Sequence, residues 1–307
     1  MKKIILFLMI CVLLCTYTAC SVTDSASEDK IPVSDMALAG DPTEAESKVE
    51  DELPVVEEPV EAAIQEQIIY DENDIKVTAK ALEESLLGTG ITVLVENNSS
   101  RNITVQTRKS SINGLMIETL FSCDVAAGKK ANDSIIFYDY ELEISGIETI
   151  KDMEFSLHIF DTDSWEDIAD SDMIVLTTSV DDSFVQEYNT EGLVAYEDEI
   201  YKVVVQKLDS DDSFWGSDIF VYIENNGDKN ITVQTRDVSI NGFMLDPLFS
   251  CDIMAGKKAY STISFFESDL EDNGIADITE LEVKFHIFNS DTWNDIFETD
   301  AITINFE

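Results

Sequence analysis

Apolar and polar residues alternate along most of this chain, in short runs that end in clusters of turn residues. Val, Ile, Phe and Thr dominate the runs, and β-branched or aromatic residues with a period of two predict strands that are buried on one face. In the first half, this pattern predicts strands at 75–82, 91–97, 103–111, 115–125, 134–138, 153–160 and 173–178. So many short strands in about 110 residues are typical of an antiparallel β-sandwich, and the predicted fold class is all-β.

Glycine marks the turns between the predicted strands. Asn113-Gly114 and Asn241-Gly242 lie between apolar residues. Both central residues of a type I′ hairpin turn need a positive φ, which Asn and Gly tolerate, so we predict a tight hairpin at each pair. A second turn is predicted at 127–128 and 255–256, where Ala precedes Gly.

The whole pattern occurs twice. NNSSRNITVQTRKSSINGLM at 97–116 recurs as NNGDKNITVQTRDVSINGFM at 225–244, which is 128 residues further on. LFSCDVAAGKKA at 120–131 recurs at the same offset as LFSCDIMAGKKA at 248–259. Because a period above one hundred residues is the size of a domain, we predict two tandem sandwich domains rather than the turns of a solenoid.

The N-terminal residues have a different composition. Lys2 and Lys3 precede an apolar run at 4–14 that is too short for a comfortable membrane span, which is typical of a secretion signal. The end of this segment, YTAC, resembles the lipobox of bacterial lipoproteins, although Tyr17 stands where leucine is usual. We expect cleavage before Cys20 and lipidation of its thiol; an ordinary signal peptide and an uncleaved anchor are the alternatives.

The segment that follows contains four of the five prolines, many acidic residues and no aromatic residue, so it cannot build a core. It is predicted to be a disordered stalk. The predicted organisation is then a lipoprotein signal peptide at 1–19, an acidic linker at 20–67, a first sandwich at 68–180, an inter-domain linker at 181–193 and a second sandwich at 194–307. The predicted location is the extracytoplasmic face of the cell membrane, projecting toward the cell wall.

The chain is strongly acidic, with a formal net charge of −44. Removal of the signal peptide takes away two lysines and changes this to −46. Nucleic acids bind through Lys and Arg that displace counterions, so nucleic acid is excluded as a partner. Solubility of a surface protein explains the acidity, and binding of cations or of a basic partner is the alternative.

NITVQTR, SINGxM, FSCDxxAGKKA and HIFxxDxW resemble repeats in secreted proteins and lipoproteins of clostridia and related Gram-positive bacteria. The resemblance covers both copies. It implies immunoglobulin-like β-sandwiches at the cell surface without an assigned activity, and it brings no catalytic residues. The disulfide-and-tryptophan pattern of antibody domains is missing, so the term describes architecture only.

Each copy contains one cysteine and one histidine. Cys123 and Cys251 alternate with apolar residues, which predicts buried core thiols, and a disulfide between two equivalent interior positions is geometrically unfavourable. His158 and His286 fall on the opposite strand face from their apolar neighbours, which predicts half-exposed side chains. No nucleophile motif accompanies them, so we predict no enzyme, no catalytic residue and no cofactor.

An acidic segment surrounds a tryptophan in both copies. Its members, the candidate ligand-site residues, are Asp161, Asp163, Trp165 and Asp167 in the first copy and Asp291, Trp293 and Asp295, with Asn289, in the second. Alternating carboxylates can bind Ca²⁺, but the glycine and distal glutamate of an EF-hand loop are missing, and a solvated acidic loop is the alternative. The tryptophans can stack on sugars or close the end of a sandwich.

The sequence therefore predicts a non-catalytic binding or adhesion module that is attached to the membrane through a lipid anchor. Its partner is an unknown extracytoplasmic protein or glycan. The alternatives are a structural spacer or accessory subunit of a cell-envelope complex, and a hydrolase. A binder should expose the same aromatic or concave patch in both copies, whereas a spacer should not.

Overall fold

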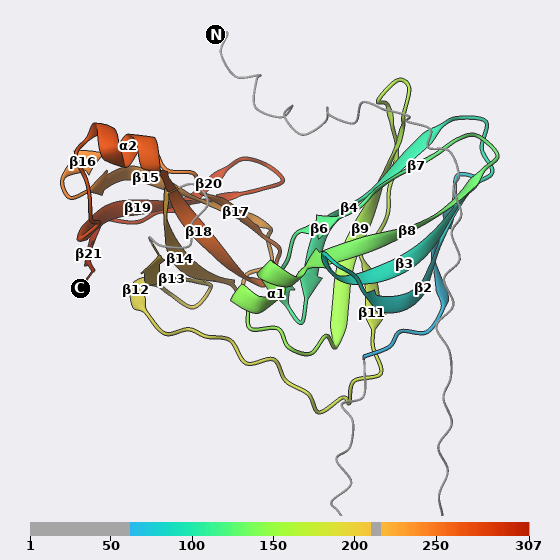
Figure 1. Cartoon of the computed structure of the whole chain (residues 1–307), viewed down its shortest axis with the longest axis horizontal. Helices are drawn as coiled ribbons and strands as arrows, with labels where there is room; N and C mark the ends of the chain where they lie inside the picture. The colour runs from blue at the N-terminus through green and yellow to red at the C-terminus, as the bar shows by residue number, and fades with distance from the viewer. Residues whose placement is uncertain (1–61, 210–215, 307) are drawn as a thin grey trace, which may run out of the picture. The chain divides into compact units, whose positions relative to one another are not determined.

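The computed structural model describes residues 62–209 and 216–306. Two β-sandwiches occupy these ranges, and they correspond to the two copies of the sequence (Figure 1). We call them repeat 1 and repeat 2. The predicted signal peptide, Cys20 and most of the predicted acidic linker lie outside the described residues.

Repeat 1 consists of two antiparallel sheets. The first has the order β1 (Gln67–Glu72), β2 (Ile75–Glu84), β3 (Gly88–Asn97), β8 (Lys130–Tyr138) and β6 (Thr119–Leu120). The second is built on β4 (Ile103–Ile112), which pairs along one edge with β9 (Asp152–Asp161) and along the other with β5 (Leu115–Met116) and β7 (Ser122–Val125). The free edge of β9 pairs with β10 (Asp167–Asp170) and β11 (Ile174–Thr177).

Repeat 2 has the same arrangement. Its first sheet contains β12 (Leu193–Glu197), β13 (Tyr201–Asp209), β14 (Gly216–Asn225) and β18 (Lys258–Phe266). Its second sheet is built on β15 (Ile231–Ile240), which pairs with β16 (Phe243–Met244), β17 (Ser250–Ile253) and β19 (Glu280–Asn289). The strands β20 (Asp295–Glu298) and β21 (Ile302–Asn305) pair with β19.

The connections between the sheets have an immunoglobulin-like order. β3 and β4 follow each other in the chain but lie in different sheets, and the same is true of β8 and β9. Because β3 pairs with β8 and β4 pairs with β9, the chain crosses between the sheets in a Greek-key pattern. The predicted class, two all-β immunoglobulin-like sandwiches, is confirmed.

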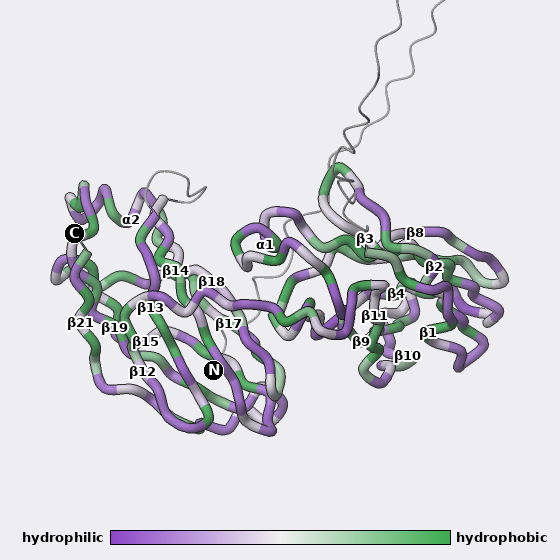
Figure 2. The backbone as a smooth tube through the Cα atoms, turned by 90° about the horizontal axis from the view of Figure 1, so that it is seen from below, coloured by the Kyte–Doolittle hydropathy of each residue, from purple (hydrophilic) through white to green (hydrophobic). Residues whose placement is uncertain are grey.

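Hydrophobic and hydrophilic residues alternate along the strands (Figure 2), and the hydrophobic ones form the core of each sandwich. In β9, Met153, Phe155, Leu157 and Ile159 all have 0% exposed surface. Each such side chain contributes about 1.5–3 kcal/mol by leaving water. The cores of the two repeats are separate clusters, so each repeat has its own source of stability.

Two short helices follow the last strand of the first sheet, α1 (Asp139–Ile144) in repeat 1 and α2 (Glu267–Asp272) in repeat 2. The sequence pattern did not predict them, because six residues show too little periodicity. Each buries one leucine, Leu142 or Leu270, against its sandwich. Within the described ranges, no helix is long and apolar enough to span a membrane.

The predicted strand at 115–125 is wrong in detail, because the chain forms three short strands there. β5 and β7 pair with β4, while β6 between them pairs with β8 in the other sheet. Ile117 and Phe121 are nevertheless buried, so the apolar pattern continues through the break and imitates one strand. β1 and β10 lie outside the predicted set.

The predicted turns are present. Asn113 and Gly114 have φ values of 49° and 82°, and Asn241 and Gly242 have 50° and 83°. Gly128 and Gly256 also have positive φ values, of 68° and 72°. The Asn113 side chain also links the turn to a distant segment. Its Oδ1 accepts hydrogen bonds from the backbone N–H groups of Lys151 and Asp152.

Candidate functional site

One loop in each repeat contains all the candidate residues of the acidic segment. We call it the tip loop, and it comprises residues 161–167 between β9 and β10 in repeat 1 and residues 289–295 between β19 and β20 in repeat 2. The loop leaves the sheet at one strand and returns along its edge. The sequence alone brings these residues together, and the fold decides which of them face solvent.

A side-chain oxygen at the first position shapes the tip loop. Asp161 Oδ1 accepts hydrogen bonds from the backbone N–H groups of Asp163 and Ser164, at 3.0 and 2.9 Å. These bonds, above all the one from Ser164, lower the pKa of Asp161. In repeat 2, Asn289 Oδ1 accepts the equivalent bond from Thr292 at 2.8 Å. An amide oxygen therefore replaces the carboxylate without changing the turn.

The tryptophan at the fifth position has an unusual backbone. Trp165 and Trp293 have φ values of 63° and 61°, a left-handed conformation that costs a bulky residue about 1 kcal/mol. Their backbone N–H groups donate to the carbonyl oxygens of Asp161 and Asn289, at 2.8 Å in both repeats. The side chains are 75% and 76% exposed. They project into solvent, so neither closes the end of its sandwich.

Each indole stacks on a phenylalanine of the preceding strand. The Trp165 and Phe160 ring centroids are 5.5 Å apart with an interplanar angle of 16°, and Trp293 and Phe288 are 5.7 Å apart at 21°. The ring of His158 or His286 comes next, with its centroid 5.5 or 5.3 Å from the phenylalanine. We call these three rings the aromatic column. The phenylalanine covers one face of the indole, and the high exposure of the side chain leaves the other face accessible.

The prediction of half-exposed histidines is wrong. His158 and His286 are 4% and 6% exposed. The alternation placed them correctly on the outer face of the sheet, but side chains of other segments lie against them there, Asp167 and Asp170 at His158 and Asp295 and Arg236 at His286. These side chains belong to other segments, and strand periodicity contains no information about them.

The two histidines have different partners. His158 Nδ1 lies 2.7 Å from Asp170 and its Nε2 lies 3.4 Å from Asp167. His286 Nε2 lies 2.8 Å from Asp295, while its Nδ1 lies 2.9 Å from the guanidinium of Arg236. Because arginine has no acceptor, Nδ1 of His286 accepts and Nε2–H donates to Asp295. His158 Nδ1 and both nitrogens of His286 thus form hydrogen bonds with neighbouring side chains.

Apart from Asp161, each candidate carboxylate of the tip loops has its own side-chain partner, so the carboxylates do not converge on one point. Asp163 Oδ2 accepts from Asn102 Nδ2 at 3.0 Å, and Asp291 Oδ2 accepts from Asn230 Nδ2 at 3.1 Å. Asp167 and Asp295 face the histidines. Among residues 62–209 and 216–306, no group of three or more His, Cys, Asp or Glu is arranged to hold a metal ion.

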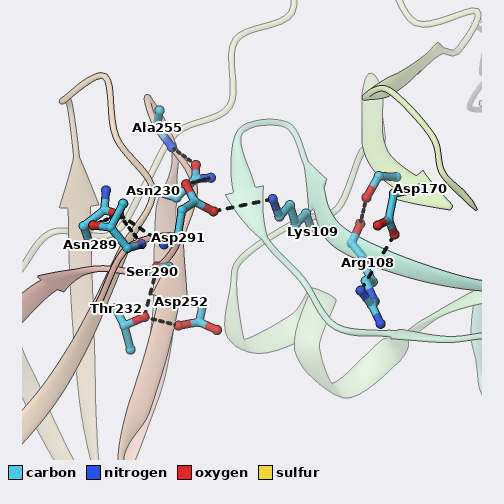
Figure 3. A network of polar contacts seen from close by, with 12 residues as sticks. Arg108, Lys109, Asp170, Asn230, Thr232, Asp252, Ala255, Asn289, Ser290 and Asp291 are labelled. Atoms are coloured by element: carbon cyan, nitrogen blue, oxygen red, sulfur yellow. Dashed lines mark hydrogen bonds and ion pairs between the residues drawn. The ribbon is translucent and has the colours of Figure 1, made fainter. Parts of the chain in front are cut away.

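Asn102 and Asn230 are structural residues that the sequence reasoning did not single out. Figure 3 shows Asn230 between the tip loop and the turn after β17, where its Oδ1 accepts from the Ala255 backbone N–H at 3.1 Å. Asn102 forms the same bond with Ala127, also at 3.1 Å. The available signal was the asparagine that begins the repeated NITVQTR motif. Part of that motif thus positions the tip loop.

The cysteines are buried, as the alternation predicted. Cys123 and Cys251 are 3% and 8% exposed, and both are free thiols. Burial raises the pKa of each to about 12, and Asp133 adds to the effect at Cys123. A thiol with such a pKa stays protonated at neutral pH and is a poor nucleophile.

Comparisons with known proteins add little to this geometry. No family model and no curated protein matches the chain. Among solved structures, it is similar to a chain in the complex of the CsuC chaperone with the CsuE tip adhesion subunit, from archaic chaperone-usher Csu pili of Acinetobacter baumannii. The identity is 14%, the match covers 70% of this chain and 90% of that one, and the TM-score is 0.21. So low a score carries no argument about function.

Proposed function

We propose that this protein is a lipid-anchored, extracytoplasmic surface protein whose two sandwiches are non-catalytic binding modules. The observation that carries the proposal is the duplicated indole, which is three-quarters exposed, backed by a phenylalanine and held at a positive φ in both repeats. Large exposed aromatic side chains on a rigid support are typical contact residues.

The shared indole favours a binder over a spacer. A spacer needs rigid domains but gains nothing from an exposed ring, whose apolar surface costs free energy in water. The left-handed backbone at the same residue adds a further cost. Two identical contacts on one chain also increase the overall affinity for a partner with repeated features.

The polar groups of the described residues support the non-catalytic part of the proposal. A histidine that acts as a general base needs a free ring nitrogen within reach of a substrate, and His158 Nδ1 and both nitrogens of His286 are hydrogen-bonded to neighbouring side chains. The two thiols are protonated and buried. A hydrolase would need a nucleophile beside His158 or His286, and the geometry around these rings consists of carboxylates and one arginine.

The anchoring part of the proposal rests on the sequence YTAC at residues 17–20. Substitution Cys20→Ser removes the thiol that would receive the lipid. We expect the wild-type chain to sediment with membranes and the variant to be released or to stay unprocessed. The mass of the mature N-terminal peptide provides the direct measurement, and an unmodified Cys20 in the mature protein would exclude lipidation.

The binding part can be tested with the whole processed chain. Purified protein is mixed with isolated cell envelopes, and the bound fraction is compared between wild type and the double variant Trp165→Ala/Trp293→Ala. We expect most of the binding to be lost in the double variant. Equal binding of both proteins, or none by either, would favour the spacer or accessory-subunit alternative.

A further inference from the structure

Exposed carboxylates flank each indole along the tip loop, and this inference rests on the binding function proposed above. Asp163, Glu166 and Asp167 are exposed beside Trp165, and Asp291 and Asp295 are exposed beside Trp293. The face of an aromatic ring is the negative part of its quadrupole. We propose that the tip loops bind a basic segment of a partner protein, with an arginine or lysine side chain on each indole face and its charge toward the carboxylates.

The charge of the tip loops selects this occupant. A cation over an indole is attracted by the ring, and nearby carboxylates strengthen that attraction. An anionic polymer would be repelled by the same carboxylates and by a chain in which 63 acidic residues outnumber 19 basic ones. A neutral sugar can stack on the indole, but the surrounding charge contributes nothing to its binding.

A protein segment fits the tip loops better than a lone ammonium ion, because a single cation–π contact contributes too little free energy. One exposed cation–π contact contributes only about 0.5–1 kcal/mol, so a small cation would bind weakly. Several basic side chains on one segment can contact an indole and its carboxylates together. Arginine fits best, because its planar guanidinium stacks on an indole while its edge donates hydrogen bonds to carboxylates.

The two tip loops differ in charge, and the difference provides an internal control. Glu166 of repeat 1 corresponds to Asn294 of repeat 2, while the indoles have the same exposure and backbone. A ligand recognised by charge should therefore bind the tip loop of repeat 1 more tightly. A neutral ligand recognised by stacking should bind both equally.

The experiment titrates the whole processed chain by calorimetry with a short arginine-rich peptide. An acidic peptide of equal length and a neutral oligosaccharide are the comparison ligands. We expect Trp165→Ala to weaken binding of the basic peptide roughly two- to fivefold. Glu166→Asn should weaken it about twofold, and Asn294→Glu should strengthen it about twofold, because exposed ion pairs contribute little individually. Each effect should shrink at high salt, where exposed charges are screened.

The charge exchanges protect the test against misfolding, because each variant introduces the residue that the other repeat already has at that position. Binding of the basic peptide that is unchanged by both Trp→Ala substitutions would overturn the proposal and reveal only diffuse attraction to an acidic surface. Absence of peptide binding would overturn it too. If the oligosaccharide binds in a way that depends on the tryptophans and not on salt, the ligand is not cationic. That result would overturn this inference and leave the proposed binding function intact.

Discussion

The tip loops of the two repeats have the same backbone with different chemistry at the first position. Asp161 in repeat 1 and Asn289 in repeat 2 both accept hydrogen bonds from the backbone at the third and fourth positions of the loop. The structure therefore requires an oxygen there, not a charge. Asp161 is therefore a turn residue, whereas the tryptophan four residues later exposes three-quarters of its surface in both repeats.

The histidines give a second comparison. His158 lies between two carboxylates, while His286 lies between a carboxylate and Arg236. The equivalent arginine in repeat 1, Arg108, lies 3.8 Å from Asp170 instead (Figure 3). The same buried ring position therefore tolerates a second carboxylate in one repeat and an arginine in the other.

The largest expected effect on the free energy of unfolding is at the buried asparagine that begins the repeated motif NNxxxNITVQTR in each repeat. Asn97 and Asn225 are 0% exposed, and their amide nitrogens donate to two and three backbone carbonyls, respectively. Replacement by alanine removes a hydrogen bond from buried carbonyl oxygens, that of Val125 in repeat 1 and those of Ile253 and Met254 in repeat 2. We expect each substitution to lower the free energy of unfolding by about 2–4 kcal/mol, with Asn225→Ala the more damaging.

Denaturant unfolding of the whole chain measures these losses, and Asn98→Ala is the matched control. Asn98 is the exposed neighbour of Asn97, so its substitution should change the free energy of unfolding by less than about 0.5 kcal/mol. Equal losses for Asn97→Ala and Asn98→Ala would show that the buried amide does not support the motif.

A second prediction concerns how the two cores are filled. The equivalent strands contain Phe155 and Leu157 in repeat 1 but Val283 and Phe285 in repeat 2, all with 0% exposure. The large ring thus occupies neighbouring positions of the same face. Phe155→Val should cost about 2 kcal/mol through the cavity it leaves, and Leu157→Phe alone should cost about 1–3 kcal/mol through overpacking.

The double variant Phe155→Val/Leu157→Phe reproduces the arrangement of repeat 2. We expect it to be more stable than the sum of the single losses predicts, because the new ring fills part of the cavity. Unfolding of the four proteins in denaturant provides the cycle. Strict additivity would mean that the two positions pack independently.

A smaller effect is expected at the exposed tryptophan. Trp165→Gly removes an indole that is 75% exposed and relieves a positive φ that glycine adopts freely. The loss of stacking on Phe160 opposes that gain, so the free energy of unfolding should change by less than about 1 kcal/mol. Calorimetric unfolding is the measurement, and Trp293→Gly should behave alike. A loss of several kcal/mol would make the indole a structural residue.

The smallest effect compares the tip loops through pH. The lowered pKa of Asp161 means that its charged form is favoured by folding. Its contribution to stability is complete above the unfolded value of 3.8 and is lost as the pH falls below it. The folded protein with Asp161→Asn should therefore lose slightly less stability at acid pH than the wild type, and the protein with Asn289→Asp should lose slightly more. Melting temperatures between about pH 5 and pH 2.5 test this, and identical pH profiles for all three proteins would exclude the coupling.

Much of the fold could be predicted from local patterns. The predicted strands at 75–82, 91–97 and 103–111 correspond to β2, β3 and β4, and both Asn-Gly turns have the positive φ values expected of them. The strand at 115–125 failed because a two-residue pairing with the other sheet leaves the apolar alternation intact. Periodicity records which side of a strand faces the core, and it does not record the sheet to which the strand belongs.

The candidate site was predicted less completely. The acidic segment and its tryptophan were identified in both repeats, but the aromatic column was not, because Phe160 belongs to a strand and Trp165 to the loop that folds back over it. Asn102 was missed for a similar reason, since it lies 61 residues from the carboxylate that it holds. A local sequence pattern does not indicate contacts between residues that lie so far apart in the chain.

By itself, the sequence determined the all-β class, the duplication and the turns, because a period of two and the backbone freedom of glycine act over a few residues. Only the tertiary structure decided that the outer-face histidines are buried and that the indoles beside them are exposed. Exposure depends on which side chains lie against a strand face, and here they come from the edge strand, the tip loop and, at His286, the neighbouring strand β15, whose positions are set by packing.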